Sequence, residues 1–130
     1  MIEFHLNTAS GVSPYLQLVQ QVRRALLLGL LAEGDQLPTV KDVVAHLAIN
    51  PNTVLKAYRE LEHSGLVAAR AGVGTFVTST RSDASLAAHG PLRQELERWF
   101  GKARRAGLDD ESIEALFQDT FRTLTEQGVA

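Results

Sequence analysis

Apolar residues recur at helical spacing in the first part of the chain. Ser13 and Pro14 make a favoured pair of cap and first position at the start of a helix. The apolar positions that follow lie mostly three or four residues apart and are Tyr15, Leu18, Val19, Val22, Leu26 and Leu30. One side of an α-helix collects residues at this spacing, so the segment predicts an amphipathic helix. We expect the stretch that contains Gly34 and Pro38 to end it.

Two further segments of helical spacing are separated by a very short turn. Thr39, with Asp42 three residues later, predicts the start of a second helix. Asn50, followed by Pro51, predicts the start of a third helix, which should end at Gly65. Their apolar positions are Val40, Val43, Val44 and Leu47 in the second helix and Val54, Ala57, Tyr58 and Leu61 in the third.

The spacing changes after the third helix. Two short β-prone runs, Leu66–Ala69 and Thr75–Val77, flank a turn that contains Gly72 and Gly74, so we expect a β-hairpin. Three helices followed by a hairpin predict a winged helix-turn-helix. In that fold, the third helix lies in the major groove of DNA.

The last part of the chain predicts a helical hairpin. Residues 78–91 are mostly small and polar and indicate a linker or the frayed start of a helix, so we divide the chain into domains at residues 1–79 and 80–130. The apolar positions of the second domain are Leu92, Leu96, Trp99, Phe100 and Ala103, then Ile113, Leu116, Phe117, Phe121 and Leu124. Gly107 separates the two groups, and Asp109 or Asp110 is the expected cap of the second helix. The fold class is therefore α+β and mostly helical.

Composition narrows the class of protein. The chain has 130 residues, of which 45% are hydrophobic and 22% charged, as in ordinary soluble proteins. It has no apolar run near the roughly 20 residues of a membrane span and no signal-peptide pattern, so we expect a cytoplasmic protein without membrane contact. It has no cysteine, and its four histidines show no ligand-like spacing. We therefore expect no metal and no cofactor. Ser, His and Asp occur, but no nucleophile, base and orienting residue are grouped in a recognisable motif, so we expect no catalytic residues.

Net charge does not by itself indicate a nucleic-acid-binding protein, because the chain carries a net charge of −2. In the first domain, the basic residues are Arg23, Arg24, Lys41, Lys56, Arg59 and Arg70, and equally many acidic residues balance them. The acidic excess lies in the second domain. A local basic surface on the first domain is compatible with these numbers.

The start of the third helix carries more small polar groups than a cap requires. Asn50, Asn52 and Thr53 can each bond the helix end or DNA, and an asparagine side chain can make two hydrogen bonds to adenine. Lys56 lies one turn beyond Asn52 and shares its outward side. Asn52 and Lys56 are candidates for base contacts, whereas Asn50 has two open interpretations, as a cap and as a DNA contact.

The segment from Gly34 to Val77, with the run INPNTVLKAY, resembles the DNA-binding domain of the GntR family of bacterial transcription regulators, and in particular its YtrA-like subfamily. The resemblance implies a dimeric repressor, often of transporter genes. It places the DNA contacts at Lys41, Asn50, Asn52, Thr53, Lys56, Arg70 and Gly72. Of these, we expect Lys41 and Arg70 to contact phosphates. The family usually has arginine at the position of Lys41, and lysine cannot make the two-pronged arginine contact.

We therefore expect a DNA-binding transcriptional regulator, a repressor that binds a two-fold symmetric operator as a homodimer. Two short helices cannot bury their aromatic residues alone, so the dimer interface is assigned to Trp99, Phe100, Phe117 and Phe121. Whether a small-molecule effector is sensed is left open, and a site for one would lie at a dimer or domain interface. The alternative is a winged-helix module for protein–protein interaction, which the balanced charge of the first domain favours.

Overall fold

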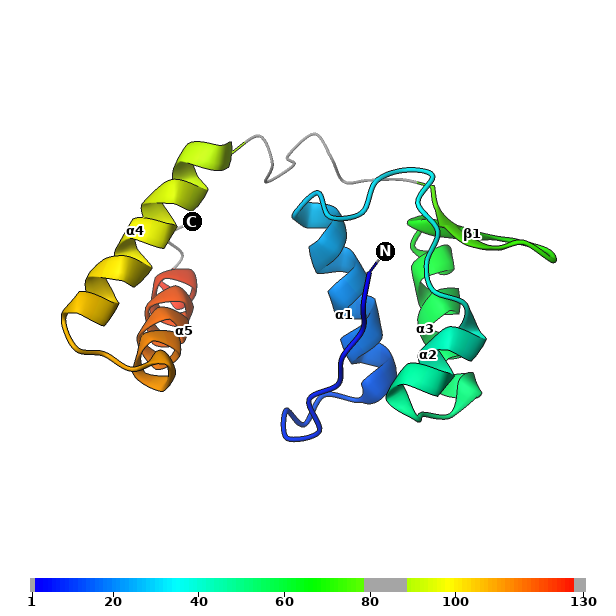
Figure 1. Cartoon of the computed structure of the whole chain (residues 1–130), viewed down its shortest axis with the longest axis horizontal. Coiled ribbons are helices and arrows are strands. Elements are labelled where there is room, and N and C mark those ends of the chain that lie inside the picture. The colour runs from blue at the N-terminus through cyan, green and yellow to red at the C-terminus, as the bar shows by residue number, and fades with distance from the viewer. Residues whose placement is uncertain (1, 79–88, 128–130) are drawn as a thin grey trace. The chain divides into compact units, whose positions relative to one another are not determined.

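The computed structural model describes residues 2–78 and 89–127 (Figure 1). The chain divides into an N-terminal unit, Met1–Ala88, and a C-terminal unit, His89–Ala130. The domain boundary expected after Ser79 lies outside the described residues and stays a prediction.

The N-terminal unit is a winged helix-turn-helix, as predicted. Its elements are α1 (Pro14–Leu27), α2 (Val40–Leu47), α3 (Pro51–His63), β1 (Val67–Arg70) and β2 (Gly74–Val77). α1 and α2 both pack against α3, and the two strands form the antiparallel hairpin that projects from the unit in Figure 1. The register pairs Val67 with Val77 and Arg70 with Gly74. The first strand lies one residue later than expected.

The apolar stripes of the three helices meet in one core, with one correction. The buried residues include Leu18, Val22, Val54 and Leu61, each with no exposed surface. Leu30, which we had placed on the first stripe, is 72% exposed, and Leu31 is buried instead. The reason is that α1 ends at Leu27 and the backbone reverses at Gly29, whose φ is 75°.

Both expected caps of the helix-turn-helix are present. The Thr39 hydroxyl accepts a hydrogen bond from the Asp42 backbone N–H at 3.1 Å, and the Asn50 side-chain oxygen accepts one from the Asn52 N–H at 2.8 Å. Between the helices, Ala48 adopts left-handed backbone angles, with φ 54° and ψ 44°. This conformation turns the chain sharply enough for α3 to begin three residues later.

A segment that the sequence pattern did not reveal supports the hairpin. Residues 34–37 run along the outer edge of β2, where the Gly34 N–H donates to the Val77 carbonyl and the Leu37 N–H donates to the Thr75 carbonyl, at 2.8 and 2.9 Å. The Val77 N–H returns a bond to the Asp35 carbonyl. β2 is therefore hydrogen-bonded on both sides, which anchors the hairpin to the helical core.

The N-terminal segment is also held in place by a contact that we did not predict. Gln17 is 8% exposed, and its side-chain amide bonds the Asn7 backbone N–H and carbonyl, the Ser10 hydroxyl and the Val12 carbonyl. Phe4 inserts into the core with 3% of its surface exposed. The segment before α1 is thus part of the N-terminal unit.

The C-terminal unit is the predicted helical hairpin, formed by α4 (Gly90–Arg105) and α5 (Asp110–Glu126). The Asp109 carboxylate caps α5 by accepting a hydrogen bond from the Ser112 N–H at 2.8 Å. Hydrogen bonding to Ser112, first from its side chain and second from its backbone N–H, lowers the pKa of Asp109. Gly107 has a φ of 94°, which allows the chain to reverse between the helices.

Candidate nucleic-acid interface

α3 has a buried side and an exposed side, as an amphipathic helix should. Val54, Ala57, Tyr58 and Leu61 are buried, whereas Asn52, Lys56 and Arg59 are exposed and Thr53 is half-buried. The Tyr58 hydroxyl donates a hydrogen bond to the Pro38 carbonyl. Burial, with a smaller contribution from the Asp42 carboxylate, raises the pKa of Tyr58 far above its usual range. Tyr58 is therefore a core residue.

The two asparagines at the start of α3 have different surroundings. The Asn50 side-chain oxygen already accepts a hydrogen bond from the Asn52 backbone N–H, which uses one of its two lone pairs and fixes the amide as the cap of α3. The Asn52 side chain is exposed and makes no hydrogen bond to another described residue. Because adenine recognition needs both the oxygen and the nitrogen of the amide, the uncommitted amide of Asn52 is better suited to it than the amide of Asn50, which the cap bond holds in place.

Two basic side chains of the candidate interface lie over aromatic rings. Lys56 Nζ is 3.9 Å from the centre of the Tyr15 ring, which belongs to the first turn of α1. The guanidinium carbon of Arg70 is 4.4 Å from the centre of the Phe76 ring on β2. Sequence spacing gave no signal for either contact, because each joins residues from different elements.

The remaining candidates are exposed at the start of α2 and at the hairpin tip. Lys41 is the second residue of α2 and is exposed. Gly72 is exposed in the turn between the strands, with a φ of 73° and open space where a Cβ would stand. A bare backbone at this tip can approach a surface closely. The seven predicted DNA contacts thus lie on α2, on α3 with its cap, and on the hairpin.

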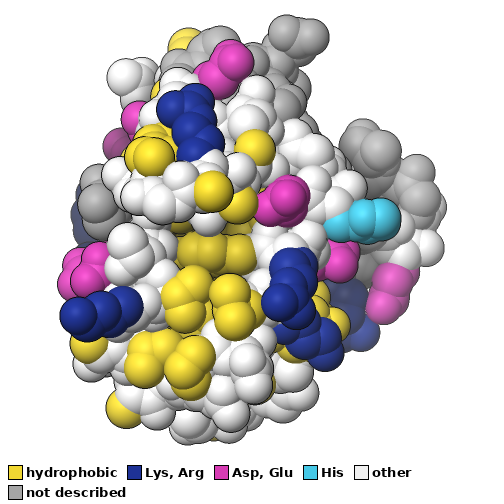
Figure 2. Space-filling view, turned by 90° about the vertical axis from the view of Figure 1, so that its right-hand side faces the viewer, with side chains coloured by type: hydrophobic (Ala, Val, Ile, Leu, Met, Phe, Trp, Pro, Cys, Tyr) yellow, Lys and Arg dark blue, Asp and Glu magenta, His cyan; other side chains and the backbone are white. Residues whose placement is uncertain are grey.

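The N-terminal unit has equal numbers of basic and acidic residues, but it can still present basic side chains to DNA because the two kinds are placed differently along α3. Residues 51–59 of α3 contain Lys56 and Arg59 and no acidic residue, whereas Glu60 and Glu62 follow toward the end of the helix. Figure 2 looks onto the side of the molecule that carries the hairpin, where Lys and Arg side chains stand apart around a central apolar area. The basic groups are therefore spread across this side.

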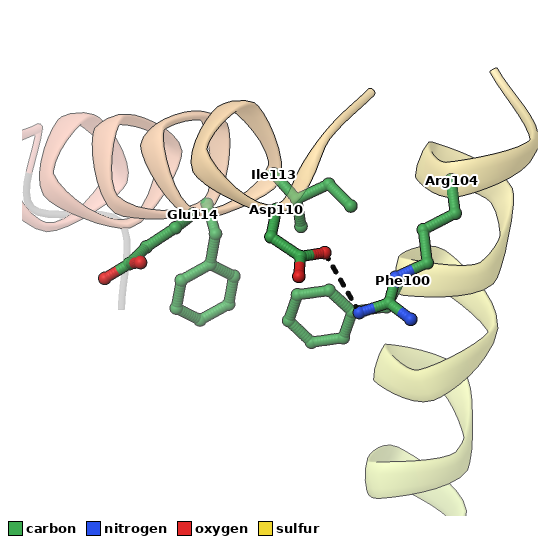
Figure 3. Close-up of a pocket in the computed structure, with 6 residues that line it drawn as sticks. Phe100, Arg104, Asp110, Ile113 and Glu114 are labelled. Atoms are coloured by element: carbon green, nitrogen blue, oxygen red, sulfur yellow. Dashed lines mark hydrogen bonds and ion pairs between the residues drawn. The ribbon is translucent and has the colours of Figure 1, made fainter. Parts of the chain in front are cut away.

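The C-terminal unit has a small pocket between its helices. The pocket measures about 190 Å³ and is lined by Phe100, Arg104, Asp110, Ile113, Glu114 and Phe117 (Figure 3). Arg104 and Asp110 form an ion pair of 3.2 Å across its rim. Drug-sized ligands occupy pockets of roughly 300 Å³ or more, so this pocket is too small for one.

The aromatic residues of the C-terminal unit form a continuous row. Ring centres are 5.2 Å apart for Trp99 and Phe100, 6.1 Å for Phe100 and Phe117, and 6.4 Å for Phe117 and Phe121. Among the described residues of this unit, only Ala103 and Ile113 are buried. The large apolar residues that it exposes are Leu92, Leu96, Leu116, Phe121 and Leu124.

The described residues contain neither a cluster of metal-binding side chains nor a helix able to cross a membrane. Across residues 2–78 and 89–127, no three His, Cys, Asp or Glu side chains gather closely enough to hold a metal ion. Within the same part of the chain, no helix has the length and apolar character needed to cross a membrane.

Comparison with known proteins identifies the family. Residues 14–77 match the profile described as bacterial regulatory proteins, gntR family. The chain is 29% identical to the transcriptional repressor YtrA of Bacillus subtilis, over 83% of this chain and 84% of YtrA. It is 36% identical to the transcriptional regulator Rv1152 of Mycobacterium tuberculosis, over 79% of this chain and 81% of that protein.

A solved structure extends the similarity to nearly the whole chain. The transcriptional antiterminator from Listeria monocytogenes EGD-e superimposes with a TM-score of 0.58 at 29% identity, over 92% of this chain and 90% of that one. These relatives are transcription regulators, so this protein is a DNA-binding regulator and not an enzyme. The resemblance drawn from the helix-turn-helix residues is confirmed, and the chain belongs to the gntR family of bacterial regulatory proteins, with YtrA-type regulators among its relatives.

Proposed function

We propose that the protein is a homodimeric repressor that acts in the cytoplasm on a two-fold symmetric operator. Each copy places α3 in the major groove, with Asn52 and Thr53 toward the bases. Lys41, Lys56 and Arg70 contact the DNA backbone, and Gly72 approaches it through its main chain. The single observation that carries this proposal is the exposed, uncommitted amide of Asn52 on the first turn of α3, next to an Asn50 that serves as the cap.

Transporter genes are our proposed targets, in line with the family resemblance. Footprinting the full-length protein on its own promoter region provides the operator. Asn52→Ala should then lower affinity for that operator by about 1–3 kcal/mol and relax discrimination at one base pair of each half-site. Random DNA of equal length is the internal control, and its affinity should change little. An equal loss on both DNAs would remove Asn52 from base recognition.

The C-terminal unit supports the homodimer part of the proposal. A two-helix unit with two buried side chains exposes a large share of its apolar residues, and so small a unit usually needs a partner for stability. Charge adds a second argument. α4 carries five basic and two acidic side chains, whereas α5 carries five acidic and one basic. Two copies related by a two-fold axis can pair α4 of one with α5 of the other.

Phe121→Asp tests this interface, because Phe121 is 62% exposed and its replacement leaves the two buried residues in place. Sedimentation should show a monomer, and operator affinity should fall on the order of 10²- to 10⁴-fold as the linkage of half-sites is lost. The matched control is Leu30→Asp on the N-terminal unit, where Leu30 is 72% exposed, and this variant should stay dimeric. A dimeric Phe121→Asp protein would place the interface elsewhere.

A further inference from the structure

The two cations that lie over aromatic rings belong to different elements of the candidate interface. Lys56 comes from α3 and meets a ring from α1, at 3.9 Å. Arg70 ends β1 and meets a ring from β2, at 4.4 Å. The face of an aromatic ring carries partial negative charge and attracts a cation within about 6 Å of its centre. Both distances lie well inside that range.

In each pair the ring is the fixed partner. Tyr15 is half-buried and packs against the core cluster, directly after Pro14 at the start of α1. Phe76 is half-buried, lies opposite Ala68 in the hairpin and also pairs with Gln36 of the supporting segment. Lys56 and Arg70 are exposed. Long exposed side chains normally sample many rotamers, so the rings restrict the cations and not the reverse.

We propose that Tyr15 and Phe76 are positioning residues that hold Lys56 and Arg70 ready as phosphate contacts. This inference rests on the proposed binding of DNA and revises one expectation. Lys56 was a candidate base contact, but its ammonium is turned toward α1, whereas the base-reading amide is that of Asn52 on the first turn of α3. The Lys56 ammonium, held between α3 and α1, is therefore better placed for a phosphate at the edge of the major groove than for a base inside it.

Both cations keep free donors while they lie on their rings. A lysine ammonium has three N–H donors, and a ring on one side leaves the opposite side open to a phosphate oxygen. A guanidinium has five N–H donors in one plane, so an Arg70 whose central carbon lies over the Phe76 ring keeps donors with which it can bind a phosphate by two parallel bonds. Each cation can therefore contact its ring and a phosphate at the same time. The ring orders the cation's side chain before DNA binds.

The first test is a double-mutant cycle on full-length protein with the footprinted operator and with random DNA. Tyr15→Leu should weaken binding to both DNAs equally, about 3- to 10-fold, because Lys56 must then be ordered on binding. Tyr15→Phe keeps the ring and should keep wild-type affinity. Tyr15→Leu should leave the salt dependence unchanged, since the charge remains, whereas Lys56→Ala should reduce the salt slope by about 1. In the Lys56→Ala background, Tyr15→Leu should have no further effect.

Three results would overturn the inference. One is an equal loss from Tyr15→Leu with and without Lys56, which would make Tyr15 a packing residue only. Another is a changed base preference in Tyr15→Leu, and the last is wild-type affinity in that variant. Wild-type protein that fails to bind DNA would overturn the proposed function and this inference together. Because Tyr15→Leu also removes packing, Phe76→Leu with Arg70→Ala gives a second cycle in the hairpin, where the same pattern is expected.

Discussion

Ala48 offers a sharp test of the turn that joins α2 to α3. Among the described residues it is the one non-glycine residue with a positive φ, at 54°. Left-handed backbone costs an alanine about 1–2 kcal/mol, because its Cβ crowds the following carbonyl oxygen. Glycine removes that cost but loses about 0.5–1 kcal/mol more conformational entropy on folding. Ala48→Gly should therefore raise the free energy of unfolding by about 0.5–1 kcal/mol.

The same substitution inside α2, the helix before the turn, supplies the control. Ala45 is exposed on α2 with right-handed helical backbone, so Ala45→Gly should lower the free energy of unfolding by about 1 kcal/mol. Urea unfolding followed by circular dichroism measures both changes. Fluorescence of Trp99, the single tryptophan, follows the C-terminal unit, whose transition should not move. Shifts of the same sign at both alanines would refute the assignment of strain to Ala48.

Three further outcomes are expected. The pKa of Tyr58 is raised in the folded state, so its contribution to stability is complete below the unfolded tyrosine pKa of about 10 and is lost at higher pH; urea unfolding should show a smaller alkaline loss in Tyr58→Phe than in wild type. Lys41→Ala should reduce the salt slope of DNA binding by about 1, whereas Arg24→Ala, an exposed basic residue of α1, should leave it unchanged in the same titration. A fragment of residues 1–79 should remain folded by circular dichroism but sediment as a monomer, and a dimeric fragment would contradict the role given to the C-terminal unit.

The sequence pattern predicted those parts of the fold that depend on local spacing. The caps at Thr39 and Asn50 and the buried side of α3 follow from residues within a few positions of one another, and all are confirmed. The prediction that Leu30 lies on the apolar side of the first helix was wrong, because the helix ends at Leu27 and Gly29 has a positive φ. The pairing of residues 34–37 with β2 was not predictable, since it depends on main-chain bonds between segments about forty residues apart.

Prediction of the interface has the same limit. Asn50, Asn52 and Lys56 were found from their place on one helix, and the resemblance to the gntR family added Lys41, Arg70 and Gly72. The cap role of Asn50 could be distinguished from the base contact proposed for Asn52 only through the observed bond from the Asn52 N–H to the Asn50 oxygen. Tyr15 was assigned only to an apolar stripe, and its contact with Lys56 became visible only when α1 and α3 were seen packed together.

The poorly covered aromatic row of the C-terminal unit has a consequence for gene control. Under the proposed assembly, an operator with two half-sites is filled by a pair of chains, and pairing depends on how many chains a cell holds. Where single chains predominate, halving their number lowers the number of pairs about fourfold. When cells grow without making more of the regulator, occupancy of the operator therefore falls more steeply than it would for a regulator that works as a single chain. Dilution alone can serve as the signal, with no small molecule required.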